Sequence, residues 1–192
     1  YSIYLLLAAL FIFFGYIVFF GNWRKNNQNF YHKNRALIFG HRGSPSYITE
    51  NTIASFEKAI EQGVDGLEFD VRLSKDKKII IFHDSNLKRL ANADKNIKDL
   101  TYDVLHEYTL NQNTKIPRLN DVAPLIHQVK VLNIEIKSDG IMQGHDILTP
   151  LIYFLNKHKI DDKCIISSFN PLILWKLKLK RPKTIIGYLY NR

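Results

Sequence analysis

The stretch Leu67-Glu68-Phe69-Asp70-Val71-Arg72-Leu73 constrains the fold most, because apolar and polar residues alternate in it with a period of two. That period is typical of a β-strand, in which alternate side chains share one face. Glu68, Asp70 and Arg72 therefore lie on one face of the predicted strand. Two carboxylates one pleat apart on a strand suited to burial repel each other unless a cation lies between them. That cation is either a divalent metal ion or the side chain of Arg72 or a lysine, and this strand alone leaves both possibilities open.

Short apolar strands alternate with helical patterns along the rest of the chain, which predicts a mostly parallel α/β domain. Either Asn51 or Thr52 suits the N-cap of the first helix of this domain, which Gly63 closes. The segment 87–115 is polar and irregular, with one helix expected near 102–108. The predicted strands are 36–39, 67–73, 79–82, 131–137, 164–168 and 184–189, and further helices are expected at 120–128, 146–157 and 171–180.

The first 22 residues predict a single transmembrane helix. No charged residue lies between Tyr1 and Phe20, and about 20 apolar residues suffice to cross a hydrocarbon core. A cleavable signal peptide fits less well, because the bulky Phe19, Phe20 and Trp23 lie where small residues are needed. Basic residues in the polar tether 23–35 place the remaining chain in the cytoplasm by the positive-inside tendency. The expected product is a single-pass membrane protein.

Composition limits the remaining possibilities. The chain has 192 residues, of which 46% are hydrophobic, and this is enough for one core, assigned to residues 36–192. A net charge of +9 suits an anionic substrate, an anionic membrane surface or nucleic acid. No dense basic helix or aromatic-and-basic motif is present, so no nucleic-acid partner is expected. The one cysteine, Cys164, lies in an apolar run and is expected to be a buried structural thiol.

Several polar groups lie at or just after predicted strands, where the strands and loops of a parallel barrel meet at one face. Three carboxylates at such a face can hold Mg²⁺ or Ca²⁺, two histidines can divide general acid and base work, and two cations can bind a phosphate. This combination predicts metal-assisted cleavage of a phosphodiester. The residues are Glu68, Asp70 and Glu135, then His41 and His83, then Arg42 and Lys137.

These residues fall within six motifs whose order resembles that of the glycerophosphodiester phosphodiesterase family, a family built on a TIM-type (β/α)8 barrel. The resemblance covers residues 37–189, and Ser167-Ser168-Phe169 fits its later pattern as well. The motifs are His41-Arg42-Gly43, Glu50-Asn51-Thr52, Glu68-x-Asp70, His83-Asp84, Ile116-Pro117-x-Leu119 and Glu135-x-Lys137.

The resemblance implies a role for each matching residue. Glu68, Asp70 and Glu135 match the family's ligands for a divalent cation, Mg²⁺ or Ca²⁺. His41 and His83 match its acid–base pair, and Arg42 and Lys137 match its phosphate contacts. The implied reaction releases an alcohol from a glycerophosphodiester and leaves glycerol 3-phosphate, with water or a neighbouring glycerol hydroxyl as the attacking group. The implied partners are a small-molecule or lysolipid phosphodiester and, through the N-terminal helix, a membrane.

Two departures from the family pattern qualify this interpretation. Lys77 occupies a turn position where the family usually has glycine. About six strands are expected, where a closed barrel has eight, and an aromatic residue that the family places late in the barrel is missing. We interpret the chain as an active enzyme in truncated form rather than a degenerate copy, and expect its open sheet to make it unstable or aggregation-prone.

Three alternative functions remain. The first is a lysophospholipase D, which a membrane anchor favours because it holds the site near lipid. The second is a non-catalytic membrane-anchored protein that binds phosphate, although such a protein needs neither histidine. The third is a phosphatidylinositol-cleaving enzyme of the same broad fold, which Glu135-x-Lys137 and Glu50-Asn51-Thr52 suit less well.

Overall fold

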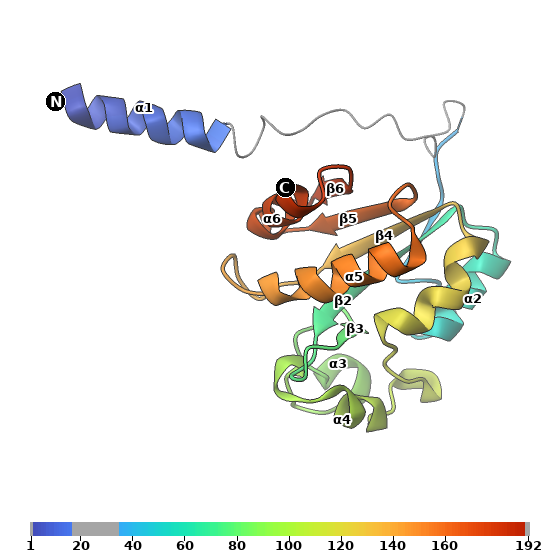
Figure 1. Ribbon diagram of the computed structural model, residues 1–192. Helices are drawn as coiled ribbons and strands as arrows, with labels where there is room; N and C mark the ends of the chain where they lie inside the picture. The colour runs from blue at the N-terminus through green and yellow to red at the C-terminus, as the bar shows by residue number, and fades with distance from the viewer. Residues whose placement is uncertain (1, 17–34, 191–192) are drawn as a thin grey trace.

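The computed structural model describes residues 2–16 and 35–190, and a twisted sheet organises the larger of these two parts (Figure 1). Five parallel strands follow one another in the order β1-β2-β4-β5-β6, and β3 pairs with β2 alone. The predicted parallel α/β architecture is therefore confirmed. The strands are β1 (Phe39–His41), β2 (Gly66–Leu73), β3 (Ile79–Ile81), β4 (Val131–Ile136), β5 (Cys164–Ser168) and β6 (Ile185–Tyr188).

The helices of this domain are mostly short. Thr52 is the N-cap of α2, since its side chain accepts a hydrogen bond from the backbone N–H of Ser55, and Asn170 caps α6 in the same way. The α-helices are α2 (Ile53–Glu61), α3 (Lys88–Ala91), α4 (Tyr102–Glu107), α5 (Leu148–His158) and α6 (Pro171–Lys180). The 3₁₀ helices are η2 (Ile97–Asp99), η3 (Asn111–Asn113), η4 (Leu119–Gln128) and η5 (His145–Ile147).

Alternation along β2 and β4 separates a packing face from a polar face. Leu67, Phe69 and Val71 are fully buried and belong to the main hydrophobic core, which also includes apolar residues of α2, η4, α5 and α6. Glu68 and Asp70 point to the opposite face of the sheet and are nonetheless 6% and 0% exposed. The strand is thus buried on both faces, and its carboxylates lie where the interior of a barrel would be.

The strand β3 corrects the predicted topology. It was expected as one of about six parallel barrel strands, but it pairs antiparallel with β2, with Val71 opposite Ile81 and Leu73 opposite Ile79. A five-residue connection between these strands is long enough for a hairpin and too short for the crossover that a parallel pair needs. Within the described part of the chain, the parallel sheet therefore has five strands.

A small lobe formed by residues 87–116, called the inserted lobe below, has a hydrophobic core of its own. The sequence suggested a polar, irregular segment with one helix, but α3, η2 and η3 fold here as well as α4. Ile80 and Phe82 of the β3 segment point into this second core, while Ile79 and Ile81 point into the main one. Because side chains alternate between the two faces of a strand, the β3 segment contributes to both cores and separates them.

The N-terminal helix α1 (Ser2–Tyr16) has 15 residues, and its large apolar side chains are exposed. The transmembrane helix expected over residues 1–22 is not supported by the structure. A helix of this length falls short of the about 20 residues that a bilayer core requires. Among all helices formed by residues 2–16 and 35–190, none is both long and apolar enough to cross a membrane. The rest of the predicted anchor and nearly all of the tether lie outside the described residues.

The turn between β2 and β3 explains why a glycine suits the position that Lys77 occupies. Lys77 has φ +60°, the left-handed region that only glycine adopts freely. Its ammonium group pairs with Asp146 at 2.7 Å, but both side chains are more than half exposed, so this ion pair contributes little.

Lys77→Gly is expected to raise the free energy of unfolding by about 0.5–1 kcal/mol, since relief of the left-handed strain outweighs the added chain entropy of glycine. Urea unfolding checks the sign, with Lys75→Gly in the same turn as the control that should destabilise. A loss of stability in Lys77→Gly would contradict the assignment of strain to this position.

Candidate active site

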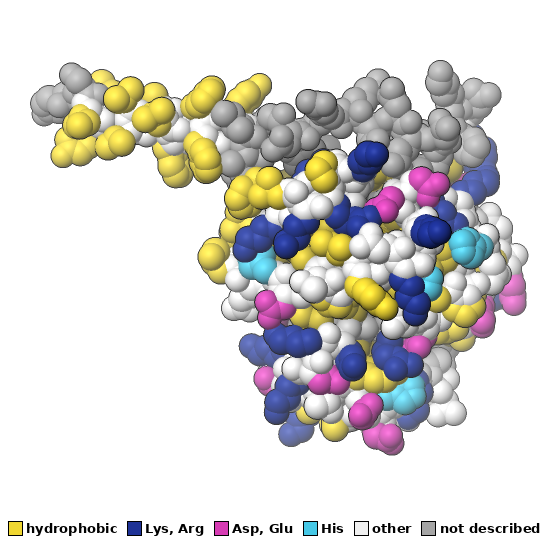
Figure 2. Space-filling view, viewed as in Figure 1, with side chains coloured by type: hydrophobic (Ala, Val, Ile, Leu, Met, Phe, Trp, Pro, Cys, Tyr) yellow, Lys and Arg dark blue, Asp and Glu magenta, His cyan; other side chains and the backbone are white. Residues whose placement is uncertain are grey.

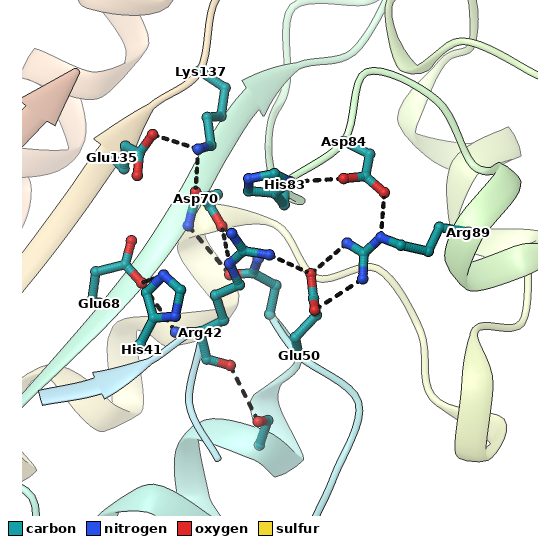
Figure 3. A network of polar contacts seen from close by, with 12 residues as sticks. His41, Arg42, Glu50, Glu68, Asp70, His83, Asp84, Arg89, Glu135 and Lys137 are labelled. Atoms are coloured by element: carbon teal, nitrogen blue, oxygen red, sulfur yellow. Dashed lines mark hydrogen bonds and ion pairs between the residues drawn. The ribbon is translucent and has the colours of Figure 1, made fainter. Parts of the chain in front are cut away.

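Three carboxylates from two neighbouring strands form the centre of the site. Because β2 and β4 are parallel, the register places Asp70 opposite Glu135 and Glu68 opposite Asn133. One oxygen from each of Glu68, Asp70 and Glu135 lies within 4.8 Å of the others, and all three residues are buried. The sequence therefore correctly predicted that these three side chains converge (Figure 3).

The electrostatics of this cluster fit a bound divalent cation. Burial, together with the nearby charge of Asp70, raises the pKa of Glu68 to about 8. Its Oε1 atom is buried and has no hydrogen-bond partner among the described residues. A buried carboxylate oxygen without a partner costs free energy, which a hard cation with oxygen ligands would recover. The donor set of three carboxylates therefore fits Mg²⁺ or Ca²⁺.

Two cationic side chains lie against the same cluster. The Lys137 ammonium is 3.1 Å from Oδ1 of Asp70 and 2.5 Å from Oε1 of Glu135. The Arg42 guanidinium lies 3.3 Å from Oδ2 of Asp70, and its Nη1 donates a 3.0 Å hydrogen bond to Glu50. The sequence left open which cation lies beside Asp70, and in the structure both Lys137 and Arg42 do. Arg72, which was also considered, pairs instead with Asp139 at 2.8 Å.

A tight turn after β1 fixes Arg42 against the carboxylates. The backbone N–H of Arg42 donates to Oε2 of Glu68 at 3.0 Å, and Arg42 itself has φ +57°. Gly43 follows with φ +87°, and a Cβ atom there would lie 2.5 Å from the hydroxyl of Ser55. The turn is therefore possible only with glycine at this position, which is the physical reason for the Gly after His41-Arg42.

The two histidines reach the site by different routes. His41 ends β1, and its Nε2 is 3.8 Å from Oε2 of Glu68 while its side chain is 68% exposed. His83 follows β3, which runs antiparallel, so it is not brought here by the meeting of parallel strand ends. The hairpin instead returns to the level of Asp70, whose carbonyl accepts a 3.0 Å hydrogen bond from the N–H of Phe82.

Four further side chains support the residues that the sequence singled out. Asn51 clamps Asp70, donating from Nδ2 to Oδ2 at 2.8 Å and accepting from the Asp70 N–H at 3.2 Å. Oδ1 of Asp84 lies 2.7 Å from Nδ1 of His83, within hydrogen-bond distance. Arg89 then bridges Asp84 and Glu50 with bonds of 2.6–3.0 Å. A continuous series of charged contacts thus runs from His83 to Arg42 (Figure 3).

These supporting residues were only partly visible in the sequence. Glu50, Asn51 and Asp84 fall within the motifs quoted above, but no role in the site was assigned to them, and Asn51 was considered only as a helix N-cap. Arg89 was not considered, and nothing in its surroundings identifies it, because its partners lie 5 and 39 residues away in the chain. Only the fold of the inserted lobe brings Arg89 to the site, through α3.

Arg89→Lys is expected to lower kcat by about tenfold to 100-fold with a smaller change in KM, since misplacing a reacting group by about 1 Å has effects of this size. Lysine keeps the charge but cannot bond Asp84 and Glu50 simultaneously in a planar fork. Steady-state kinetics on a glycerophosphodiester check this, with Arg118→Lys as the control because Arg118 pairs with Asp121 away from the site. Equal losses in both variants would show a general rather than a local effect.

Comparison with known proteins identifies the family. The model of the glycerophosphoryl diester phosphodiesterase family matches residues 41–192. The chain belongs to this family. A glycerophosphodiester phosphodiesterase of Caldanaerobacter subterraneus is 36% identical over 165 residues, covering 82% of this chain and 68% of the relative. A lysophospholipase D of Mus musculus is 34% identical over 173 residues, covering 79% of this chain and 54% of the relative.

Solved structures of glycerophosphodiester phosphodiesterases agree with the fold described above. The enzyme of Thermotoga maritima superposes with a TM-score of 0.67 at 37% identity, covering 84% of this chain and 65% of that one. A phosphodiesterase of Oleispira antarctica, in complex with the product sn-glycerol 3-phosphate, superposes with a TM-score of 0.72 at 31% identity. It covers 80% of this chain and 65% of that one. This chain thus spans about two thirds of each solved TIM-barrel-like structure.

Proposed function

We propose that this protein hydrolyses glycerophosphodiesters to an alcohol and sn-glycerol 3-phosphate with the help of a divalent cation. The observation that carries the proposal is the buried cluster of three carboxylates with two cationic side chains and two histidines around it. The product complex of the related Oleispira antarctica phosphodiesterase supports this substrate class.

Glu68, Asp70 and Glu135 would hold the cation. When bound, Mg²⁺ or Ca²⁺ supplies positive charge that polarises the phosphoryl oxygens and lowers the pKa of a bound water. Arg42 and Lys137 bind and orient the phosphate, because each presents N–H donors beside the cluster. Lys137 also neutralises the cluster, and a substrate phosphate therefore competes with Asp70 and Glu135 for its ammonium group.

The histidines divide the proton transfers. Oδ1 of Asp84 lies 2.7 Å from Nδ1 of His83, and this hydrogen bond orients the ring so that Nε2 points away from the carboxylate. His83 accordingly donates its proton to the oxygen of the departing alcohol as the P–O bond breaks. His41, the more exposed histidine, takes the proton of the attacking water as the new P–O bond forms. Where a glycerol hydroxyl attacks instead, water opens the resulting cyclic phosphate in a second step to give sn-glycerol 3-phosphate.

The identity of the products tests this proposal. Glycerophosphocholine is incubated with the protein and Mg²⁺ or Ca²⁺, and the products are resolved by ³¹P NMR. The proposal expects sn-glycerol 3-phosphate and choline. Phosphocholine and glycerol as the products would overturn it, as would the absence of turnover of both glycerophosphocholine and glycerophosphoinositol in a folded sample with metal present.

A lysophospholipase D activity is the second candidate, favoured by the similarity to the Mus musculus lysophospholipase D. Both activities cleave the same kind of phosphodiester, and they differ in whether the glycerol side carries an acyl chain. Supplying lysophosphatidylcholine in the same assay separates them. Release of lysophosphatidic acid and choline at a rate above that of glycerophosphocholine cleavage would make this the principal activity.

We also propose that the N-terminal segment attaches the protein to a lipid bilayer with the catalytic domain on the cytoplasmic side. The support is that helix α1 is apolar all round and exposes large side chains, such as Phe11 at 79% and Tyr4 at 74%. Helices that are apolar all round are buried in a core or in lipid. Flotation with liposomes tests this, with a variant lacking residues 1–34 as the control, and equal recovery of both in the dense fraction would contradict it.

A further inference from the structure

A cavity of about 200 Å³ opens beside the candidate active site, between the β2–β3 turn and the loop that follows β4. Lys137 lines it, so the cavity begins where the proposed phosphate contacts end. Arg72 also lines it, and its Nε donates a 2.9 Å hydrogen bond to the carbonyl of His83. The cavity therefore touches both the phosphate contact and the backbone of the residue that we assign to the leaving group.

The charge of this cavity is strongly positive. Five cationic side chains line it against two carboxylates, and both carboxylates are already paired, Asp139 with Arg72 and Asp146 with Lys77. The remaining cations are Lys137 and two exposed lysines, Lys75 and Lys98. Within residues 35–190 neither of these two lysines has an ion pair, so their charges are available to a ligand.

The neutral part of the lining combines polar side chains with the apolar Leu73 and Ile97. Ser85 and Gln143 contribute a hydroxyl and an amide, which suit the hydroxyls of a polyol. None of the described residues that line the cavity is aromatic, so it lacks the rings that recognise a quaternary ammonium group. Figure 2 shows Lys and Arg side chains over the whole of this face, and in its lower part, below α5 in the same view of Figure 1, Asp and Glu side chains lie among them.

We propose that this cavity is the subsite for the substrate's head group and that it selects phosphorylated polyols over choline or ethanolamine. This rests on the proposed function, because the head group is the alcohol that His83 protonates. A phosphate monoester on the head group reaches Lys75 and Lys98, while the scissile phosphate stays at Arg42 and Lys137. The two anions of one substrate thus meet separate sets of cations.

A matched pair of substrates tests the selectivity. Glycerophosphoinositol 4-phosphate and glycerophosphoinositol differ only in the phosphate monoester. The ratio of their kcat/KM values is expected to favour the phosphorylated substrate, and to fall about fivefold in the double variant K75Q/K98Q, the range for two exposed ion contacts. The variant K157Q/K180Q removes the same charge from α5 and α6 and is expected to keep the ratio.

Binding without turnover provides a separate readout. Titration calorimetry compares inositol 1,4-bisphosphate with inositol 1-phosphate on the wild type and on both double variants. The bisphosphate is expected to bind about fivefold more weakly to K75Q/K98Q, with the monophosphate unchanged.

The outcomes separate the two proposals. Turnover with an unchanged ratio in K75Q/K98Q, or an unchanged affinity for the bisphosphate, would overturn the head-group subsite and leave the proposed function intact. Absence of turnover of every glycerophosphodiester, together with weakened bisphosphate binding in K75Q/K98Q, would overturn the proposed function and leave the cavity as a site for phosphorylated polyols.

Discussion

Glu68→Gln is expected to lower phosphodiesterase activity by about 1,000-fold or more, since a catalytic cation contributes several kcal/mol of transition-state stabilisation. Glutamine has the shape of glutamate but lacks the charge that would hold the cation with Asp70 and Glu135. The buried position of Glu68, at 6% exposure, allows this substitution with little change in packing. Initial rates with saturating Mg²⁺ and Ca²⁺ measure the loss.

The same substitution is expected to stabilise the metal-free protein. The pKa of Glu68 is about 8 in the folded state against an ordinary value of 4.5, so the folded state binds more protons than the unfolded state between these pH values. Stability of the metal-free wild type therefore falls as the pH rises from about 4.5 to about 8. At pH 8 this costs a few kcal/mol, which Glu68→Gln avoids because glutamine does not ionise.

Glu68→Gln is thus expected to be less active than the wild type but more stable without metal. Thermal unfolding in EDTA from pH 5 to pH 8 measures the stability. Glu61→Gln is the matched control, because Glu61 lies on the surface of α2 and, among the described residues, pairs only with Lys58. It is expected to change neither activity nor the pH dependence. Activity of Glu68→Gln within tenfold of the wild type, or a lower melting temperature than the wild type at pH 8, would contradict the assignment.

His83→Ala is expected to lower the rate by about 100-fold to 10,000-fold on substrates with an alcohol leaving group, the usual range for loss of a general acid. The loss should be small when the leaving group is 4-nitrophenolate, because this anion departs without taking up a proton. A general acid and a residue that only maintains the fold are distinguished by this comparison, since the second would slow both substrates alike.

Steady-state rates on glycerophosphocholine and on the 4-nitrophenyl ester of glycerol phosphate provide the measurement. His127→Ala, at an exposed position in η4, is the control and should leave both rates unchanged. His41→Ala is expected to slow both substrates, because deprotonation of the attacking group precedes either departure. Equal losses for both substrates in His83→Ala would remove the leaving-group role from this residue.

The sequence predicted the sheet well where the local pattern and the tertiary structure demand the same thing. The strand 164–168 and the helix 171–180 match β5 and α6 at both ends, since Asn170 and Pro171 mark the start of the helix unambiguously. The helix predicted over 120–128 is present as η4, but it is a 3₁₀ helix with Pro124 inside it, a type that the sequence pattern did not specify. Proline there removes a backbone donor from the helix.

The candidate site was predictable in its centre and not at its edge. Glu68, Asp70 and Glu135 interrupt strands that are mostly apolar, and charge in a buried strand is visible in any single sequence. Arg89 lies on an exposed helix of four residues, where an arginine is unremarkable until the fold brings it to Glu50 and Asp84. The antiparallel direction of β3 was missed for a related reason, because an apolar run does not reveal its partner strand.

The central claim is that the carboxylate cluster binds a cation needed for phosphodiester cleavage. The most direct test adds Mg²⁺ or Ca²⁺ stepwise to the EDTA-treated full chain while following both the release of sn-glycerol 3-phosphate from glycerophosphocholine and the melting temperature. The account predicts that both quantities rise with the same half-saturating metal concentration, and that neither responds in Asp70→Asn. Full activity in EDTA, or an unchanged metal response in Asp70→Asn, would contradict it.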